Sequence, residues 1–205
     1  MKKLLLLIVI IFISISSFSQ EKQIIDEDCI YIFTRSTMSK RGFIAEDFNI
    51  NDTLSTHVGI GFVENKKYVI YNIDNIKKNE NQSSLIKEDY NSFVRLDDIY
   101  YSSIWKYKIT KSNKIRLIEI LKSFERENIT FDKEFKLTNS NSNLYCSEFV
   151  FLVLTQLNLT IKYEPPKKKL NSFYSSLLKR NTLEYIPVDF FLELHCFKLV
   201  ENKFY

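Results

Sequence analysis

The feature that most constrains the fold is a pair of apolar segments separated by four polar residues. Residues 57–63 and 68–73 are rich in Val, Ile, Tyr and Phe, and Glu-Asn-Lys-Lys lies between them. Two β-branched and aromatic runs joined by so few residues predict an antiparallel β-hairpin. We therefore expect an antiparallel sheet to be part of the fold.

Other segments are predicted to add strands and helices to this hairpin. Residues 28–35 and 100–110 have the composition of strands. An amphipathic helix is predicted to begin at Ser112-Asn113, a plausible N-cap, and to end near Asn128. Residues 149–154 are apolar on all sides, which predicts a helix buried all round. The apolar positions of the amphipathic helix are three residues apart: Ile115, Ile118, Leu121 and Phe124.

The remaining segments are predicted to be loops and a strand-rich tail. Residues 36–54 and 74–92 are polar enough to be loops. Pro165-Pro166 breaks the chain, and strand-like stretches follow at 185–194 and 196–200. The sequence has no internal repeat and no interdomain linker. The sum predicts a single α+β domain in which helices pack against an antiparallel sheet.

The first nineteen residues have the layout of a secretory signal peptide. Lys2 and Lys3 precede an apolar run at 4–15, and a small-residue zone at 16–20 permits cleavage after Ser19. A retained membrane anchor is the alternative, although the run is short for a span. We expect an exported protein, periplasmic or extracellular, with one domain at 20–205 and no stable membrane span after cleavage.

The charge balance gives no support for a nucleic-acid partner. Loss of Lys2 and Lys3 with the signal lowers the basic residues from 29 to 27, against 25 Asp and Glu. The resulting excess is too small for a nucleic-acid-binding surface. The one local basic run is Lys167-Lys168-Lys169. It is predicted to be a solvated turn or, alternatively, a contact with an anionic surface.

Two of the three cysteines and the second histidine have structural explanations. If Cys146 is kept free for chemistry, Cys29 and Cys196 could pair as a disulfide. Two buried free thiols are the alternative, because cysteine is often a small core residue. His195 is adjacent to Cys196, and on a strand their side chains would point to opposite faces. We therefore expect His195 to be structural.

The third cysteine, Cys146, lies where the buried helix is predicted to begin, within Leu-Tyr-Cys-Ser-Glu-Phe at 144–149. The free N–H groups and dipole of a helix N-terminus lower the pKa of a thiol, and a nearby imidazolium lowers it further. The backbone N–H of Cys146 could also stabilise an oxyanion. Cys146 is therefore a candidate nucleophile. A buried structural cysteine is the alternative.

The candidate general base is His57, at the start of the hairpin. Strand alternation places His57, Gly59 and Gly61 on one face, where the glycines leave room for a helix carrying Cys146. An imidazole at that position could take the proton of the thiol. A strand-end histidine with a structural hydrogen bond is the alternative.

Together these residues resemble the YiiX-type branch of the NlpC/P60 superfamily, a set of circularly permuted papain-like cysteine hydrolases. In that branch the histidine strand precedes the cysteine helix. Here Thr-His-Val-Gly-Ile at 56–60 precedes Tyr-Cys-Ser-Glu-Phe-Val at 145–150. Residues 28–33 resemble the family's opening strand, and 131–135 resemble its aromatic-Asp segment. The resemblance spans residues 28–155.

The resemblance implies a permuted papain-like fold with Cys146 as nucleophile at a helix N-terminus and His57 as general base. The family orients the imidazole with a polar group, often a Glu on the next strand. That strand has no Glu here, and Asn72 is the best substitute, since its side-chain carbonyl could hold the Nδ1–H group. Glu148, also in the resembled motif, is expected to interact with free N–H groups at the helix start.

The function implied by the resemblance is a secreted cysteine hydrolase that cleaves an amide or peptide bond through an acyl-enzyme. A peptidoglycan fragment or other peptide is the expected substrate. An acyl-lipid hydrolase or acyltransferase of the same fold is one alternative. A catalytically silent binding domain is another, because the orienting Glu is missing. No cofactor or metal is expected, since two distant histidines and no Cys-x-x-Cys give no ligand spacing. The oligomeric state is left open.

Overall fold

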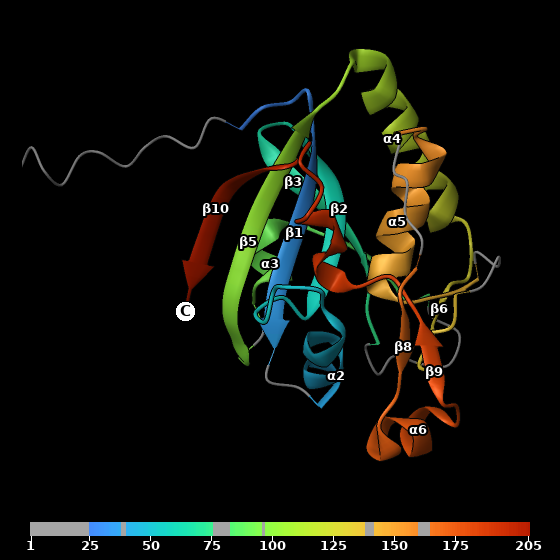
Figure 1. Ribbon diagram of the computed structural model, residues 1–205. Helices are drawn as coiled ribbons and strands as arrows, with labels where there is room; N and C mark the ends of the chain where they lie inside the picture. The colour runs from blue at the N-terminus through green and yellow to red at the C-terminus, as the bar shows by residue number, and fades with distance from the viewer. Residues whose placement is uncertain (1–24, 38–39, 76–82, 96, 138–141, 160–164) are drawn as a thin grey trace, which may run out of the picture.

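A large antiparallel sheet forms the centre of the structure. A computed structural model describes residues 25–37, 40–75, 83–95, 97–137, 142–159 and 165–205. Within them, six strands pair in the order β10-β5-β1-β2-β3-β4, and every adjacent pair is antiparallel (Figure 1). The strands are β1 (Cys29–Thr37), β2 (His57–Glu64), β3 (Lys67–Ile73), β4 (Leu85–Glu88), β5 (Ile99–Lys108) and β10 (Lys198–Phe204).

Helices and two small sheets surround this sheet. The long helices α4 (Lys111–Glu125) and α5 (Cys146–Gln156) lie side by side on one of its faces (Figure 1). The remaining helices are α2 (Lys40–Phe48), α3 (Tyr90–Phe93), α6 (Ser172–Leu178) and the 3₁₀ helix η1 (Val188–Phe191). The small sheets pair β6 (Thr130–Phe131) with β7 (Asn143–Leu144) and β8 (Lys167–Lys169) with β9 (Thr182–Glu184).

The alternation of β1 divides the interior into two layers. Ile30 and Ile32 enter the core between the sheet and α4–α5, whereas Tyr31 and Phe33 enter a smaller core that α3 covers with Phe93. Both faces of β1 are therefore apolar, which explains why its sequence is apolar without a break. Burial of both faces makes β1 a fixed central strand.

The predicted hairpin is confirmed and is tighter than expected. Glu64 pairs with Lys67, so Asn65 and Lys66 alone form the turn, and both have positive φ angles, 51° and 61°. This is the backbone of a two-residue hairpin turn. A Cβ atom on Gly61 would lie 2.0 Å from the carbonyl oxygen of Val69. Gly61 is therefore required by the close approach of β3.

Several predicted boundaries are wrong, chiefly in the polar segments. The predicted loop at 36–54 contains α2, and the one at 74–92 contains β4 and the start of α3. The stretch at 185–194 was predicted to be strand-like but is irregular and holds the 3₁₀ helix. Its consecutive large side chains are buried in the core, whereas those of a strand would alternate between two faces. The predicted strands at 28–35 and 100–110 are confirmed as β1 and β5.

The two predicted helices are confirmed with changes. The side chain of Thr110, and not Ser112-Asn113, caps α4 by accepting a hydrogen bond from the N–H of Asn113 at 3.2 Å. Ile115 is 60% exposed, because the buried face follows four-residue spacing as well as three: Leu117, Ile120, Leu121 and Phe124. α5 is buried along much of its length, although Thr155 is exposed, so it is not buried all round.

The predicted signal peptide, residues 1–19, lies outside the described residues. Of the helices that the structure describes, none has the length and hydropathy to cross a bilayer. The three cysteines are free thiols, so of the two alternatives for Cys29 and Cys196 the structure has free thiols and not a disulfide. Cys29 is buried, as the alternative expected, but Cys196 is exposed.

Candidate active site

One cavity of about 410 Å³ brings the candidate residues together. Its volume falls within the range of roughly 300–1,000 Å³ that is usual for ligand pockets. Both polar and large apolar side chains line it. The polar group includes Arg35, His57, Asp74 and Cys146. The apolar group includes Phe48, Phe131, Phe135, Leu183 and Val188.

Cys146 is the first residue of α5, as the sequence predicted, and its side chain is buried at the cavity wall. Its two neighbours fix this helix start to one residue, Ile186. The hydroxyl of Tyr145 accepts a hydrogen bond from the Ile186 N–H at 2.8 Å, and the hydroxyl of Ser147 donates to the Ile186 carbonyl at 2.7 Å. The thiol is therefore held in a rigid position between two clamped residues.

The environment of Cys146 keeps its thiol protonated. Burial raises the pKa of Cys146 to about 11, and the negative charge of Asp74 acts in the same direction. The backbone N–H groups of Val58 and Ser147 oppose this shift without overcoming it. The expectation that the helix N-terminus would lower the pKa is wrong for this state, because desolvation outweighs the dipole.

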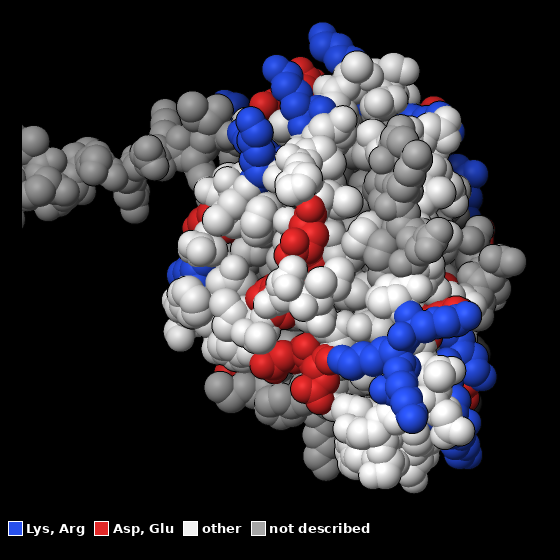
Figure 2. All heavy atoms as spheres, in the orientation of Figure 1, with Lys and Arg blue, Asp and Glu red and all other residues white. Residues whose placement is uncertain are grey.

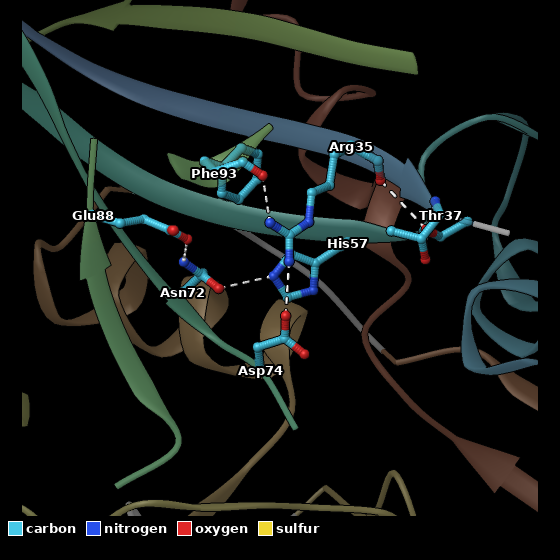
Figure 3. A network of polar contacts seen from close by, with 8 residues as sticks. Arg35, Thr37, His57, Asn72, Asp74, Glu88 and Phe93 are labelled. Atoms are coloured by element: carbon cyan, nitrogen blue, oxygen red, sulfur yellow. Dashed lines mark hydrogen bonds and ion pairs between the residues drawn. The ribbon is translucent and has the colours of Figure 1, made fainter. Parts of the chain in front are cut away.

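His57 is the first residue of β2 and its ring is also buried. Its Nε2 lies 3.0 Å from Oδ1 of Asn72 (Figure 3). Burial, followed by the positive charge of Arg35, lowers the pKa of His57 to about 4, while Asp74 opposes the shift. His57 is therefore neutral near pH 7, which is the form that can accept a proton.

Asn72 and Glu88 fix which nitrogen of His57 is free. The Nδ2 group of Asn72 donates to Oε1 of Glu88 at 2.8 Å, so its Oδ1 must face His57 (Figure 3). An amide oxygen only accepts, so Nε2 carries the proton and Nδ1 has the free lone pair. The contact expected between Asn72 and the ring is present, but the nitrogen is Nε2 and not Nδ1; its orienting role stays a prediction. Half-buried Glu88, on β4, supplies the carboxylate that the sequence lacked on β3.

Replacement of Glu88 tests this chain of contacts. We expect Glu88→Ala to free the Asn72 amide to turn and, for the hydrolase proposed below, to lower kcat by up to about 100-fold through misorientation of the imidazole. Glu88→Gln keeps an oxygen that can accept from Nδ2, so it should retain most of the activity. The measurement is kcat as a function of pH in both variants. Equal losses in the two, with unchanged pH profiles, would contradict an orienting role.

Arg35 and Asp74 form an ion pair beside the imidazole, and sequence reasoning missed both. Arg35 lies directly opposite His57 in the β1–β2 register, and its Nη2 is 2.7 Å from Asp74 Oδ2. Its Nη1 donates to the Phe93 carbonyl, and its guanidinium lies 4.6 Å above the Phe93 ring (Figure 3). The sequence did contain one sign of Arg35: it is a charged residue two positions after Phe33, on a face of the strand that is otherwise apolar.

Removal of the Arg35 charge should shift the titration of His57. The folded pKa is about 4 against an ordinary 6.5, so the fold favours neutral His57. That contribution to stability is complete above pH 6.5 and is lost as the pH falls towards 4. In Arg35→Met the pKa of His57 should rise, and the acid limb of kcat/KM should move to higher pH. Arg35→Lys keeps the charge and should leave the acid limb near its wild-type pH. An acid limb at the same pH in Arg35→Met as in the wild type would refute this electrostatic role.

The glycine face of β2 does not receive α5, contrary to expectation. Gly59 and Gly61 face β3 atoms, whereas α5 packs in the same core as Val58, Ile60 and Phe62. The larger apolar residues on that face give the helix more surface to bury. Cys146 and His57 therefore come to the same cavity only at the end of β2.

A buried aspartate shapes the apolar wall of the cavity. The Asp132 carboxylate accepts hydrogen bonds from the N–H groups of Glu134 and Lys136, both at 2.8 Å or less. These bonds fold the loop that places Phe131 and Phe135 at the cavity. The aromatic-Asp segment singled out in the sequence therefore builds part of the site.

The other singled-out residues lie apart from this chemistry or support it. Glu148 is buried in the first turn of α5, where a carboxylate was expected. His195 is exposed in a turn before β10, not on a strand, and is not among the described lining residues. The described residues contain no group of three His, Cys, Asp or Glu side chains able to hold a metal ion.

Comparison with known proteins identifies a shared fold. No protein-family model and no curated protein sequence matches the chain. A crystal structure of metalloprotein yiiX from Escherichia coli O157:H7 superposes with a TM-score of 0.60 at 15% identity. The match covers 85% of this chain and 97% of that one. The fold is YiiX-like. At this identity, the likeness establishes the mixed α+β architecture alone.

Proposed function

We propose that this protein is a cysteine hydrolase in which Cys146 attacks a carbonyl carbon and His57 is the general base. One observation carries the proposal: the thiol and a neutral, oriented imidazole line the same cavity. The YiiX-like fold and the order of His57 before Cys146 support membership in the permuted NlpC/P60 branch.

The proposed reaction starts from a neutral pair. Because the thiol and the imidazole are both uncharged near pH 7, the proton passes from Sγ to Nδ1 of His57 as the sulfur attacks. The carbon–sulfur bond forms, and the carbonyl electrons move to the oxygen. The backbone N–H of Cys146, at the start of α5, is the proposed donor to that oxyanion. The oxyanion electrons then re-form the carbonyl as the bond to the leaving group breaks, and His57 gives its proton to that group. Water hydrolyses the resulting thioester, which releases the acid and restores the Cys146 thiol.

Asn72 and Glu88 act in this scheme as positioning residues. The carbonyl of Asn72 holds the Nε2–H group, so the lone pair of Nδ1 is left to accept a proton. When the imidazole gains a proton, the same hydrogen bond strengthens, because a charged donor bonds more strongly. Asn72 therefore substitutes for the carboxylate that the resembled family often uses.

The substrate proposal has two candidates. An amide bond in an envelope peptide fits an exported enzyme, although export itself remains a prediction. An apolar acyl ester or amide is favoured by the wall of Phe48, Phe135, Leu183 and Val188. The name of yiiX includes the word metalloprotein, but the described residues here offer no cluster of metal ligands. No step of the proposed reaction uses a metal.

A substrate panel tests the proposal. Wild-type protein and Cys146→Ala would be incubated with peptide amides and with short-chain and long-chain acyl esters. Product release by the wild type alone supports the hydrolase, and the preferred substrate selects between the two candidates. Absence of turnover on the whole panel, with ligand binding retained, would favour a silent binding domain.

A further inference from the structure

The β8–β9 hairpin and α6 form a unit that projects from one end of the molecule, which we call the tip (residues 167–184) (Figure 1). Its inner side is anchored. Leu170, Leu178 and Leu183 are buried with Phe48 and Tyr185 in a small core. The hydroxyl of Tyr174 also bonds to the carboxylate of Asp47 on α2. The tip is therefore a fixed part of the fold with a defined outer side.

The outer side of α6 presents two large apolar side chains to solvent. Phe173 is 65% exposed and Leu177 is 51% exposed. The two residues are four positions apart, so they lie next to each other on one helix face. Figure 2 shows uncharged atoms at this end of the molecule, with Lys and Arg side chains beside them. Lys167–Lys169, predicted to be a solvated turn, instead form the exposed strand β8 of the tip.

Basic residues flank this apolar pair. The tip contains five of them, Lys167, Lys168, Lys169, Lys179 and Arg180, and a single acidic residue, Glu184. Figure 2 shows Lys and Arg side chains gathered over the β8–β9 hairpin. Lys167 pairs with Glu184, and Lys168 donates to the Asp47 carbonyl. Lys169 and Lys179 are exposed on either side of α6 in the sequence.

We propose that the tip docks on an anionic lipid bilayer, with Phe173 and Leu177 entering the headgroup region and the surrounding cations contacting lipid phosphates. Apolar side chains framed by Lys and Arg are the combination that binds the bilayer interface. Each cation near an anionic bilayer adds to the attraction. The charge of the tip is complementary to this surface and repels a second copy of itself.

Docking in this orientation would also hold the cavity close to the bilayer, with the tip between them. The tip supplies Leu183 to the cavity wall, and Tyr185, the first residue after the tip, lines the cavity too. The inner side of the tip therefore faces the cavity while its outer side faces the lipid. Docking does not require Cys146 chemistry, so it can hold or fail independently of the proposed hydrolase.

Vesicle binding tests the inference. The exported protein would be sedimented with vesicles of phosphatidylglycerol mixed with phosphatidylcholine, and with phosphatidylcholine alone. We expect binding to the anionic vesicles that weakens as salt increases. The double variant Lys169→Gln/Lys179→Gln should bind at least tenfold more weakly, since each cation contributes roughly fivefold. Phe173→Ser/Leu177→Ser should also bind at least tenfold more weakly, because it removes the apolar side chains that enter the interface.

Matched controls keep the result interpretable. Ile115→Ser removes an equally exposed apolar side chain from α4, outside the tip, and should bind as the wild type does. Cys146→Ser should also bind normally while losing turnover. Equal sedimentation with neutral and anionic vesicles, or unchanged binding by both tip variants, would overturn the inference. The inference would also be overturned if the protein bound no vesicles and formed a dimer in solution that Phe173→Ser/Leu177→Ser abolished.

Discussion

Cys146→Ala is expected to reduce turnover by about 10,000-fold or more, because it removes the atom that forms the acyl-enzyme. The substitution deletes one sulfur atom from a buried position, so the fold should persist with a modest loss of stability. Steady-state kinetics on the best substrate of the panel gives the loss, and circular dichroism checks the fold.

The two other cysteines provide the matched control for this variant. Cys196→Ala makes the same chemical change at an exposed thiol and should leave turnover unchanged. Cys29→Ala makes the same change at a buried thiol on β1 and measures the loss of folding stability when a core sulfur is removed but the nucleophile is kept. Equal turnover in Cys146→Ala and Cys196→Ala would eliminate the nucleophile assignment.

His57→Ala is expected to lower kcat by roughly 100-fold to 10,000-fold, the contribution of a positioned general base. The effect should be greatest near neutral pH. There the thiol, whose pKa is raised to about 11, depends on a base to lose its proton. As the pH rises towards 11, hydroxide can deprotonate the thiol directly, and the variant should regain part of the lost rate. The measurement is kcat against pH for the two proteins.

The second histidine is the control for the base. His195 is exposed in the turn before β10, and His195→Ala should match the wild type at every pH. A loss in His195→Ala with normal turnover in His57→Ala would assign the base to His195. A uniform loss in His57→Ala that high pH does not relieve would indicate a structural role for the imidazole.

Regular patterns in the sequence predicted the frame of this site. Strand alternation and a short polar connection gave the β2–β3 hairpin, and an unbroken apolar run gave α5 with Cys146 at its start. Asn72 was predicted to contact the imidazole from the neighbouring strand, and alternation turns its neighbour Tyr71 to the other face. The structure agrees, since Tyr71 enters the main core and donates a hydrogen bond to Glu125.

These local patterns could not predict contacts between distant residues or the burial of individual side chains. Glu88 reaches Asn72 from a short strand in a segment too polar to be predicted as part of the sheet. Arg35 meets Asp74 across 39 positions, and no local spacing indicates that pair. The thiol pKa was predicted in the wrong direction because a helix start is visible in sequence whereas the burial of its first residue is not.

The neutral thiol and imidazole have a practical consequence for chemical labelling. A thiolate probe that relies on a preformed ion pair should react slowly with Cys146 near pH 7, because burial keeps the thiol protonated. Acylating substrates differ from such probes, since His57 can take the proton during attack. Slow alkylation together with rapid acylation is therefore the pattern expected for this site.

Intact-mass measurement of the acyl-enzyme is the most direct test of the central claim. The wild type, Cys146→Ala and His57→Ala would each be mixed with an activated acyl ester, quenched with acid and analysed before and after proteolysis. The account predicts one added acyl group, located on the peptide that contains Cys146. It should form readily in the wild type, slowly in His57→Ala and not at all in Cys146→Ala. No adduct in the wild type, or an adduct carried by Cys29 or Cys196, would contradict the account.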